Sequence, residues 1–493
     1  MKFYSTRGKS FANNASEAIT KGLADDGGLF VPESFPDISC KLVEMVDMSY
    51  AERATFVISQ FLEEYDYADL LNACKNAYSK FEDGDTAPLV KLDDNLYVLE
   101  LFHGPTLAFK DVALTLLPYL LRKGADQCGV KDKIIIPVAT SGDTGKAALE
   151  GFKDNEGIAV NVFYPSEGVS DMQKLQMQTQ EGDNVNVVAV KGNFDDCQTS
   201  VKNIFNSREI AHKLKEQGVI LSSANSMNFG RLVPQVCYYF SAYCDMLAAG
   251  DIKLGDLVDF VVPTGNFGNI LAGYYAKRMG LPVGKLVCAS NVNNVLTEFF
   301  ANGTYDANRE FFKTTSPSMD ILISSNLERL IFELSNRDTV LTEQRMNQLK
   351  REGTYTISKD ELDSVSKEFF ANYADEEEWL DTISAIFDEY GYVADPHTSV
   401  ALKVNFDYKA FSGSQNPSVV LSTASPYKFT QSVVKAICGN EDKDAFKSAF
   451  KLMNETAMPI PEQILKLREK EVRFTQVVEK SQAFEALSQF INK

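Results

Sequence analysis

Seven short, nearly continuous apolar runs constrain the fold of this chain more than any other feature. They are rich in Val, Ile and Ala, do not alternate polar with apolar residues, and are separated by stretches of helical pattern. An unbroken apolar strand is stable where both faces of its sheet are covered, as in parallel sheets whose strands are joined by helices. The pattern therefore predicts an α/β fold with right-handed crossovers. The runs are residues 133–139, 159–164, 185–190, 219–222, 260–263, 286–289 and 418–422.

The chain, at 493 residues, is too long for a single hydrophobic core, so two or three packed units are expected. Between the strand runs, helices are predicted over 195–216 and 269–279. Residues 300–390 are more polar and are interpreted as a helix-rich elaboration on the core. The predicted units are an N-terminal domain over 1–90, an α/β core of two subdomains over 91–430, and a C-terminal helical segment over 431–493.

The charge of the chain disfavours nucleic acid as a partner. Lys and Arg number 49 and Asp and Glu 68, so the formal net charge is −19, and such a surface repels a phosphate backbone. The most apolar long segment, residues 232–249, contains Pro234, Gln235 and Asp245, which predicts a core helix and not a membrane span. The first residues lack the apolar stretch of a signal peptide, and the eight cysteines follow no framework pattern. We therefore expect a cytoplasmic protein with reduced thiols.

Metal chemistry is also disfavoured. The three histidines, His103, His212 and His397, stand far apart, and the chain has no His-x-x-x-His pair and no Cys-x-x-Cys motif. A zinc site built on the usual spacings is therefore not expected. The acidic run 375–378 predicts a solvated helix or loop in preference to a cation site. His212 is expected to be exposed, and for His103 and His397 both a structural role and a place in the site stay open.

Three loops follow strand runs, which is where parallel α/β proteins bind ligands. Residues 140–145 and 263–269 each place glycines at the start of a helix, where backbone amides favour a phosphate or a carboxylate. Neither loop has the G-x-G-x-x-G or G-x-x-x-x-G-K-[ST] spacing of nucleotide sites. A capped strand-to-helix turn explains the first loop equally well. The third loop, residues 422–426, offers a hydroxyl to a ring nitrogen, although an ordinary turn hydroxyl explains it too.

Lys110 is the candidate nucleophile. It follows the apolar run Leu107-Ala108-Phe109 and precedes a predicted helix. Burial among such neighbours lowers the pKa of an amine and makes it nucleophilic. The local sequence taken alone favours a different arrangement, in which the stem is packed and the ammonium group lies in water.

In this order, the motifs resemble the threonine synthase family, in its bacterial and fungal long-chain form, among the tryptophan-synthase-β-like pyridoxal phosphate enzymes. The resemblance runs from about residue 3 to 440 and continues more weakly through 459–467. It implies pyridoxal phosphate fold type II, with parallel-sheet domains covered by helices on both faces and with N-terminal and helical elaborations. The segments are ITKGLADDGGLFVPE (19–33), FHGPTLAFKD (102–111), TSGDTG (140–145), NSMNFGR (225–231), PTGNFG (263–268) and DPHTSVA (395–401).

The resemblance also implies residue roles. Lys110 is expected to bind pyridoxal phosphate covalently and to move protons at the substrate, and Thr423 to bind the pyridine nitrogen. Arg231 is preferred for the substrate phosphate because its planar fork matches an oxyanion, with Lys174 as the second choice. The cofactor phosphate is expected at Gly265, Asn266, Phe267, Gly268 and Asn269. The substrate is expected at Ser141, Gly142, Asp143, Thr144, Asn225, Ser226 and Arg231.

The family reaction converts O-phospho-L-homoserine and water into L-threonine and phosphate, the last step of threonine biosynthesis. The resemblance thus predicts a carbon–oxygen lyase acting on phosphates, with a small-molecule substrate, and it favours a monomer. Two alternatives stay open. One is a serine/threonine dehydratase-like pyridoxal phosphate lyase of the same fold, and the other is a catalytically silent homologue that binds the cofactor or an anionic metabolite.

Overall fold

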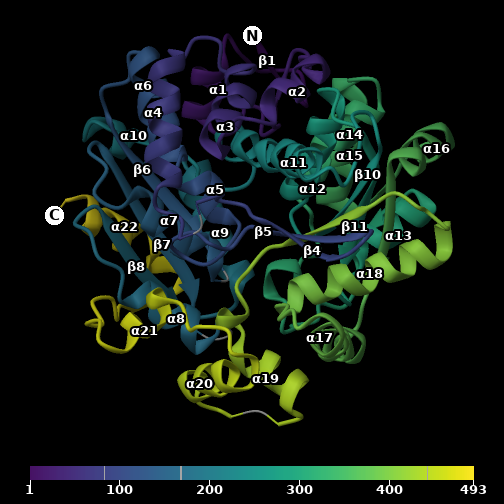
Figure 1. The fold of residues 1–493 in the computed structure, drawn as a ribbon. Helices are drawn as coiled ribbons and strands as arrows, with labels where there is room; N and C mark the ends of the chain where they lie inside the picture. The colour runs from purple at the N-terminus through teal and green to yellow at the C-terminus, as the bar shows by residue number, and fades with distance from the viewer. Residues whose placement is uncertain (83, 141, 167–168, 441, 493) are drawn as a thin grey trace.

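Two large sheets lie side by side in the computed structural model, which describes residues 1–82, 84–140, 142–166, 169–440 and 442–492. In Figure 1 the N-terminal helices lie above the sheets, and α19 (Thr430–Cys438) and α20 (Ala445–Thr456) lie below them. All seven predicted apolar runs are strands of these sheets. The predicted α/β class is therefore confirmed.

The first sheet has five parallel strands, and helices cover both of its faces. Alternate residues of its inner strand β6 (Lys133–Ala139) enter different cores: Ile134 and Ile136 join the main core, and Ile135 joins a cluster formed with α9 (Phe194–Asn206), α10 (Arg208–Glu216) and α22 (Ala483–Ile491). Burial on both sides explains why this strand shows no polar alternation. In order across the sheet, the strands are β16 (Val477–Val478), β8 (Val185–Val190), β7 (Ile158–Pro165), β6 (Lys133–Ala139) and β9 (Val219–Leu221).

The second sheet has six strands, of which only the edge strand β4 is antiparallel to its neighbour. Phe260 and Val262 pack into the main core with α11 (Phe229–Ala249) and α12 (Gly268–Arg278), whereas Val261 packs into a second core with α17 (Glu376–Tyr390) and α18 (Pro396–Ser412). The strands in order are β14 (Phe369–Tyr373), β11 (Val283–Ser290), β10 (Val258–Pro263), β15 (Ser418–Ser422), β5 (Leu96–Glu100) and β4 (Leu89–Asp93).

The remaining elements surround these sheets. The helices are α1 (Ala15–Lys21), α2 (Leu42–Met45), α3 (Tyr50–Ser59), α4 (Tyr67–Tyr78), α5 (Lys110–Leu114), α6 (Leu117–Gln127), α7 (Asp143–Phe152), α8 (Asp171–Gln178), α13 (Val295–Asn302), α14 (Leu327–Leu334), α15 (Thr339–Glu352), α16 (Lys359–Glu368) and α21 (Glu462–Leu465). The short strands β1 (Phe3–Ser5), β2 (Phe11–Ala12) and β3 (Phe30–Pro32) form an antiparallel sheet, and β12 (Thr304–Asp306) pairs with β13 (Thr354–Thr356).

One sequence prediction about these elements is wrong. The single helix predicted over 195–216 is two helices, because Ser207 takes an extended backbone and its side chain accepts a hydrogen bond from the Ile210 N–H, which starts α10. Residues 300–390 also contribute the strand β14, which lies at the edge of the second sheet. Its pairing partner β11 is distant in sequence, so no local pattern reveals it.

Two predicted helices are confirmed. The apolar segment 232–249 lies within α11, and the helix predicted over 269–279 is α12. No helix in the described ranges has both the length and the apolarity needed to cross a membrane. Asp375 caps α17, so the acidic run opens a helix, and the described residues contain no group of three or more His, Cys, Asp or Glu side chains placed to hold a metal ion.

Candidate active site

The loops beyond β6, β10 and β15 meet at the start of α5, which carries Lys110. The N–H of Phe109, the residue before Lys110, donates to the backbone oxygen of Thr423 at 2.9 Å. Thr423 directly follows β15 and is buried, and Asp143 opens α7 just beyond β6. The carboxyl edges of both large sheets thus contribute to one site, as expected for parallel α/β proteins.

Lys110 is buried, with 8% of its surface exposed. Its Nζ donates to Ser318 Oγ at 3.2 Å and lies 3.5 Å from Asp143 Oδ2, and it sits 4.8 Å from the centre of the Phe109 ring. Burial lowers the pKa of Lys110 to about 8, against the raising effect of Asp143 and with the help of Arg231 and Lys428. The arrangement favoured by local sequence, with the ammonium group in water, is therefore wrong.

A lysine pKa of about 8 predicts an early onset of amine reactivity. Because only the neutral amine is nucleophilic, about half of the Lys110 amines should react at pH 8, against less than about one per cent for an ordinary lysine. Acetic anhydride labelling of cofactor-free protein, read peptide by peptide in a mass spectrometer, measures this. Lys110 should reach half of its maximal rate near pH 8. A labelling curve that coincides with those of the surface lysines would contradict the burial argument.

Asp143 is a buried carboxylate surrounded by donors. Its Oδ1 lies 2.7 Å from Lys428 Nζ and accepts from Gln173 Nε2 at 2.9 Å, and its Oδ2 accepts from Ser318 Oγ at 3.4 Å. Burial raises the pKa of this carboxyl, but the ammonium groups of Lys428 and Lys110 outweigh burial and hold the pKa well below its usual range. Asp143 therefore stays ionised.

The rest of the 140–145 loop is shaped around Asp143. Gly142 has φ of 148°, and a Cβ there would come within 2.5 Å of the Gln173 side chain, so glycine is required. Thr144 is half-buried on the first turn of α7, and Ser141 lies outside the described residues.

The 263–269 loop leads from β10 into α12. Phe267 adopts a left-handed φ of 64°, and Gly268 begins the helix. A Cβ on Gly265 would lie 2.4 Å from the backbone oxygen of Ser318, so this loop passes directly beside that serine. Asn266 forms part of the same turn, and its backbone oxygen accepts from Asn326 Nδ2 at 2.8 Å.

Asn269 offers an unpaired donor at the start of α12. The hydroxyls of Tyr238 and Tyr239 donate to its Oδ1 at 2.5 and 3.0 Å, while its buried Nδ2 has no hydrogen-bond partner among the described residues. A buried donor left without an acceptor is costly, and a helix N-terminus attracts anions. The loop therefore fits a phosphate group.

Arg231 is a second place for an anion. It is 4% exposed, and its Nη1 donates to the backbone oxygen of Ala224 at 2.9 Å. Burial lowers the pKa of Arg231 to about 10, and within the described parts of the chain no carboxylate forms an ion pair with it. Ser226, on the same segment, accepts from Asn326 Nδ2 at 3.0 Å, and Asn225 beside it is half-buried. Asn326 thus connects the 225–231 segment to the 263–269 loop.

Three family descriptions match the chain: "Threonine synthase N terminus" over residues 2–78, "Pyridoxal-phosphate dependent enzyme" over 85–424, and "Threonine synthase, C-terminal" over 398–491. The chain belongs to the threonine synthase family. The threonine synthase of Schizosaccharomyces pombe is 37% identical over 472 residues, covering 90% of each chain, and that of Pseudomonas aeruginosa is 37% identical over 441 residues, covering 89% of this chain and 91% of the other.

Solved threonine synthase structures confirm the fold. The pyridoxal-phosphate-bound enzyme from Brucella melitensis is 38% identical with a TM-score of 0.88, and the yeast enzyme is 34% identical with a TM-score of 0.89; each match covers 100% of this chain and 99% of the other. The human protein "Threonine synthase-like 1" is 42% identical over 457 residues, covering 90% of this chain. This chain spans 61% of the length of that relative.

The threonine synthase motifs do not reveal every residue gathered around Lys110. Ser318, Lys428 and Gln173 each contact Asp143, and Asn326 connects two of the loops. These residues lie outside the quoted motifs, and Lys428 lies just after the third loop, residues 422–426. No spacing in the sequence identifies any of them as a site residue. Lys174, the second choice for the substrate phosphate, is half-buried beside Gln173.

Two of the three histidines contact glutamate side chains. His103 lies 2.7 Å from Glu100 Oε2 and stacks on Phe102. The exposed His212 lies 3.4 Å from Glu216, as expected for a surface residue.

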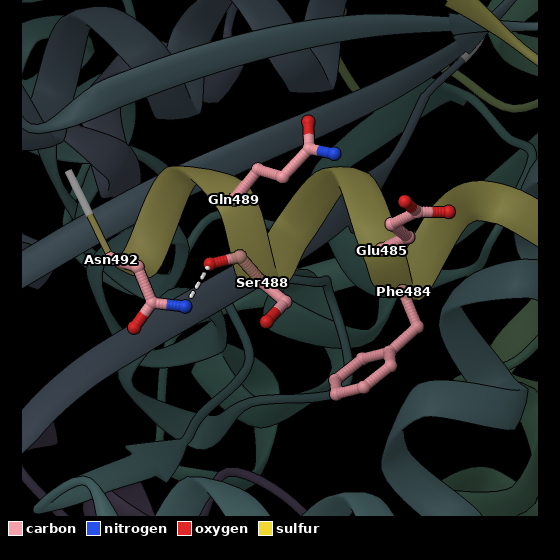
Figure 2. Close-up of a pocket in the computed structure, with 5 residues that line it drawn as sticks. All are labelled: Phe484, Glu485, Ser488, Gln489 and Asn492. Atoms are coloured by element: carbon pink, nitrogen blue, oxygen red, sulfur yellow. Dashed lines mark hydrogen bonds between the residues drawn. The ribbon is translucent and has the colours of Figure 1, made fainter.

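Figure 2 shows a surface hollow on α22, which shares no residue with the Lys110 site and contributes one carboxylate and no cation. It therefore offers nothing to a phosphate ligand. Its lining residues are Phe484, Glu485, Ser488, Gln489 and Asn492.

Proposed function

We propose that this protein is a pyridoxal-phosphate-dependent lyase that converts O-phospho-L-homoserine and water into L-threonine and phosphate. The buried excess of positive charge carries the proposal. Lys110, Lys428 and Arg231 are all buried, and the latter two act electrostatically on Lys110, with Asp143 as the paired carboxylate. In a chain of net charge −19, such a site is built for anionic ligands, and both the cofactor and this substrate carry a phosphate.

The described residues fit pyridoxal phosphate. Lys110 would bind it covalently, Thr423 would bind its ring nitrogen, and the unpaired amide of Asn269 at the start of α12 would donate to its phosphate. When bound, the cofactor withdraws electrons from the substrate carbon next to the amine. The backbone of the loop completes the phosphate site, through Gly265, Asn266, Phe267 and Gly268.

Substrate binding and proton transfer would be carried out by the chain's own residues. Arg231 would bind the substrate phosphate with help from Asn225 and Ser226, because a planar guanidinium donates two parallel hydrogen bonds to an oxyanion. The 140–145 loop, with Ser141, Gly142, Asp143 and Thr144, would surround the reacting end of the substrate. Lys110, whose pKa burial lowers to about 8, would in its neutral form remove a proton from Cα and then one from Cβ, so that the Cγ–O bond breaks and phosphate leaves. It would then return a proton to Cγ before water adds at Cβ and a proton returns to Cα.

Phosphate release and threonine formation from O-phospho-L-homoserine test this function directly. Ammonia and 2-oxobutanoate formed from threonine, without phosphate release, would instead favour the dehydratase-like lyase. A visible cofactor band with neither activity would favour the catalytically silent homologue. Failure to bind pyridoxal phosphate at all would overturn the cofactor assignment.

Arg231→Met should raise the KM for O-phospho-L-homoserine by about 10- to 100-fold, because a charge-assisted pair with the substrate phosphate is lost. The visible cofactor band should be unchanged, since Arg231 is not placed at the cofactor loop. Steady-state phosphate release measures KM, and Lys174→Met provides the matched loss of a nearby cation. A normal KM in Arg231→Met together with a raised KM in Lys174→Met would move the substrate phosphate to Lys174.

We further infer that the protein acts as a cytoplasmic monomer. Its eight cysteines are all free thiols, two of them exposed, which suits a reducing compartment. Light scattering of the purified protein tests the oligomeric state, and a mass of two chains would overturn the monomer. Fractionation of cells that express the full-length protein tests the compartment.

A further inference from the structure

A short turn from the polar 300–390 region brings a serine hydroxyl onto the reactive lysine. Residues Pro317–Met319 form this turn, and Ser318 Oγ accepts from Lys110 Nζ at 3.2 Å and donates to Asp143 Oδ2 at 3.4 Å. The backbone oxygen of Ser318 lies against Gly265, where even a Cβ would not fit. Ser318 thus lies between the lysine, the Asp143 carboxylate and the phosphate loop.

A buried histidine holds the backbone of this turn. The Ser318 N–H donates to His397 Nε2 at 3.2 Å. Because an N–H can only donate, Nε2 must be the acceptor, and the ring proton therefore sits on Nδ1, 2.6 Å from Asp395 Oδ2. His397 is 1% exposed, with its ring packed edge-on against Phe429 at 5.0 Å.

Asp395 connects His397 to the start of helix α18. It caps α18, accepting from the backbone N–H groups of His397 and Thr398 at 3.0 and 3.1 Å. The other side of the turn is fixed by Asp320, which accepts from Asn291 and from Thr314 at 2.7 Å each. The Ser318 hydroxyl is therefore presented by a rigid support.

We propose that Ser318 is a catalytic residue that orients the Lys110 amine through its hydroxyl, and that His397 and Asp395 are positioning residues for Ser318. The Asp143 carboxylate stays ionised and accepts the hydrogen bond that the Ser318 hydroxyl donates. The Ser318 oxygen can therefore only accept a hydrogen bond from Lys110. The lone pair of the neutral amine is then free for a substrate proton. Without this contact, the amine would rely on the longer contact to Asp143 Oδ2 at 3.5 Å, and its flexible four-carbon stem would be less restrained. The catalytic part rests on the proposed function.

Ser318→Ala tests the hydroxyl, and Ser399→Ala is the matched control. Ser399 is a buried serine on α18 whose Oγ donates to the Trp379 backbone oxygen of α17 at 2.6 Å. In cofactor-free protein, Ser318→Ala removes an acceptor that stabilises the ammonium form of Lys110, which should lower the pKa of Lys110. Acetylation of Lys110 should therefore begin at lower pH than in the wild type. The charged groups facing the amine, Asp143, Lys428 and Arg231, are unchanged in both variants.

In the holoenzyme, Ser318→Ala should lower kcat by about 10- to 100-fold and change KM by less than about twofold, because proton transfer is affected and phosphate binding is not. Ser399→Ala should match the wild type in both measurements. A wild-type labelling curve and a wild-type kcat in Ser318→Ala would overturn the proposal. If the wild type releases no phosphate, the proposed function fails, while the labelling curve still decides whether Ser318 contacts Lys110.

Two substitutions of His397 test the positioning role. His397→Phe keeps the packing on Phe429 but removes the acceptor, and should show the kcat loss of Ser318→Ala. His397→Gln returns an acceptor oxygen of similar reach and should recover most of kcat. Wild-type kcat in His397→Phe would overturn the positioning role. If His397→Phe does not melt cooperatively, Asp395→Asn, which keeps a capping oxygen, replaces it, and wild-type kcat there would overturn the role equally.

Discussion

Lys110→Ala should leave a folded protein that has no visible cofactor band and releases no phosphate from O-phospho-L-homoserine. We expect a loss of at least about 10³-fold in kcat, because both the covalent attachment and the proton carrier disappear with one amine. Lys428 cannot replace it, since its Nζ is held by Asp143 at 2.7 Å and by the backbone oxygen of Thr106 at 2.9 Å. Absorbance spectra and phosphate release measure the two effects.

Lys409→Ala is the control for this loss. Lys409 is a partly buried lysine 3.5 Å from Asp259 and belongs to the sheet scaffold and not to the site. Its variant should keep the band and a kcat within about threefold of the wild type. Full activity in Lys110→Ala would refute the assignment of the reactive lysine, whatever the other variants show.

Asp143→Asn should give the largest loss of stability. The substitution keeps the shape of the side chain but removes the charge opposite Lys428, whose side chain is fully buried, and leaves two buried cations without their carboxylate. Breaking a buried pair on one side costs about 3–5 kcal/mol. Since folding holds the pKa of Asp143 below its unfolded value, this contribution is fully present at neutral pH and is lost only on acidification. Urea unfolding of cofactor-free protein at pH 7 measures it.

A second variant separates charge from packing. Asp143→Asn combined with Lys428→Met removes both charges, and should recover much of the lost stability because no unpaired ion stays buried. Asp69→Asn is the surface counterpart, since Asp69 pairs with Lys123 at 2.9 Å on an exposed face, and should cost less than about 1 kcal/mol. Equal losses in Asp143→Asn and Asp69→Asn would show that the buried pair contributes no more than a surface pair.

Local pattern was enough to predict the scaffold of the site. The strands β6, β10 and β15 are apolar runs, and the loops after them carry glycines and helix-start residues that a parallel α/β chain places at the carboxyl edge of each sheet. The break between α9 and α10 was missed because the helical pattern continues through Ser207, whose capping role appears only in the folded chain, in its extended backbone and its hydrogen bond from Ile210. The strand β14 was missed because its parallel pairing with the distant strand β11 produces no periodic pattern in the local sequence.

By itself, the sequence determined the α/β class and the three loops, because these depend on residues close together along the chain. Lys110 was selected by the resemblance of the ordered motifs, since its neighbours alone favoured an ammonium group in water. Only the tertiary structure decided that the Lys110 ammonium is buried and which groups surround it. Ser318 reaches it from 208 positions away, and Lys428 and Arg231 come from other elements still. The pKa of Lys110 depends on burial and on charges brought together by folding, and neither is a property of the neighbouring residues.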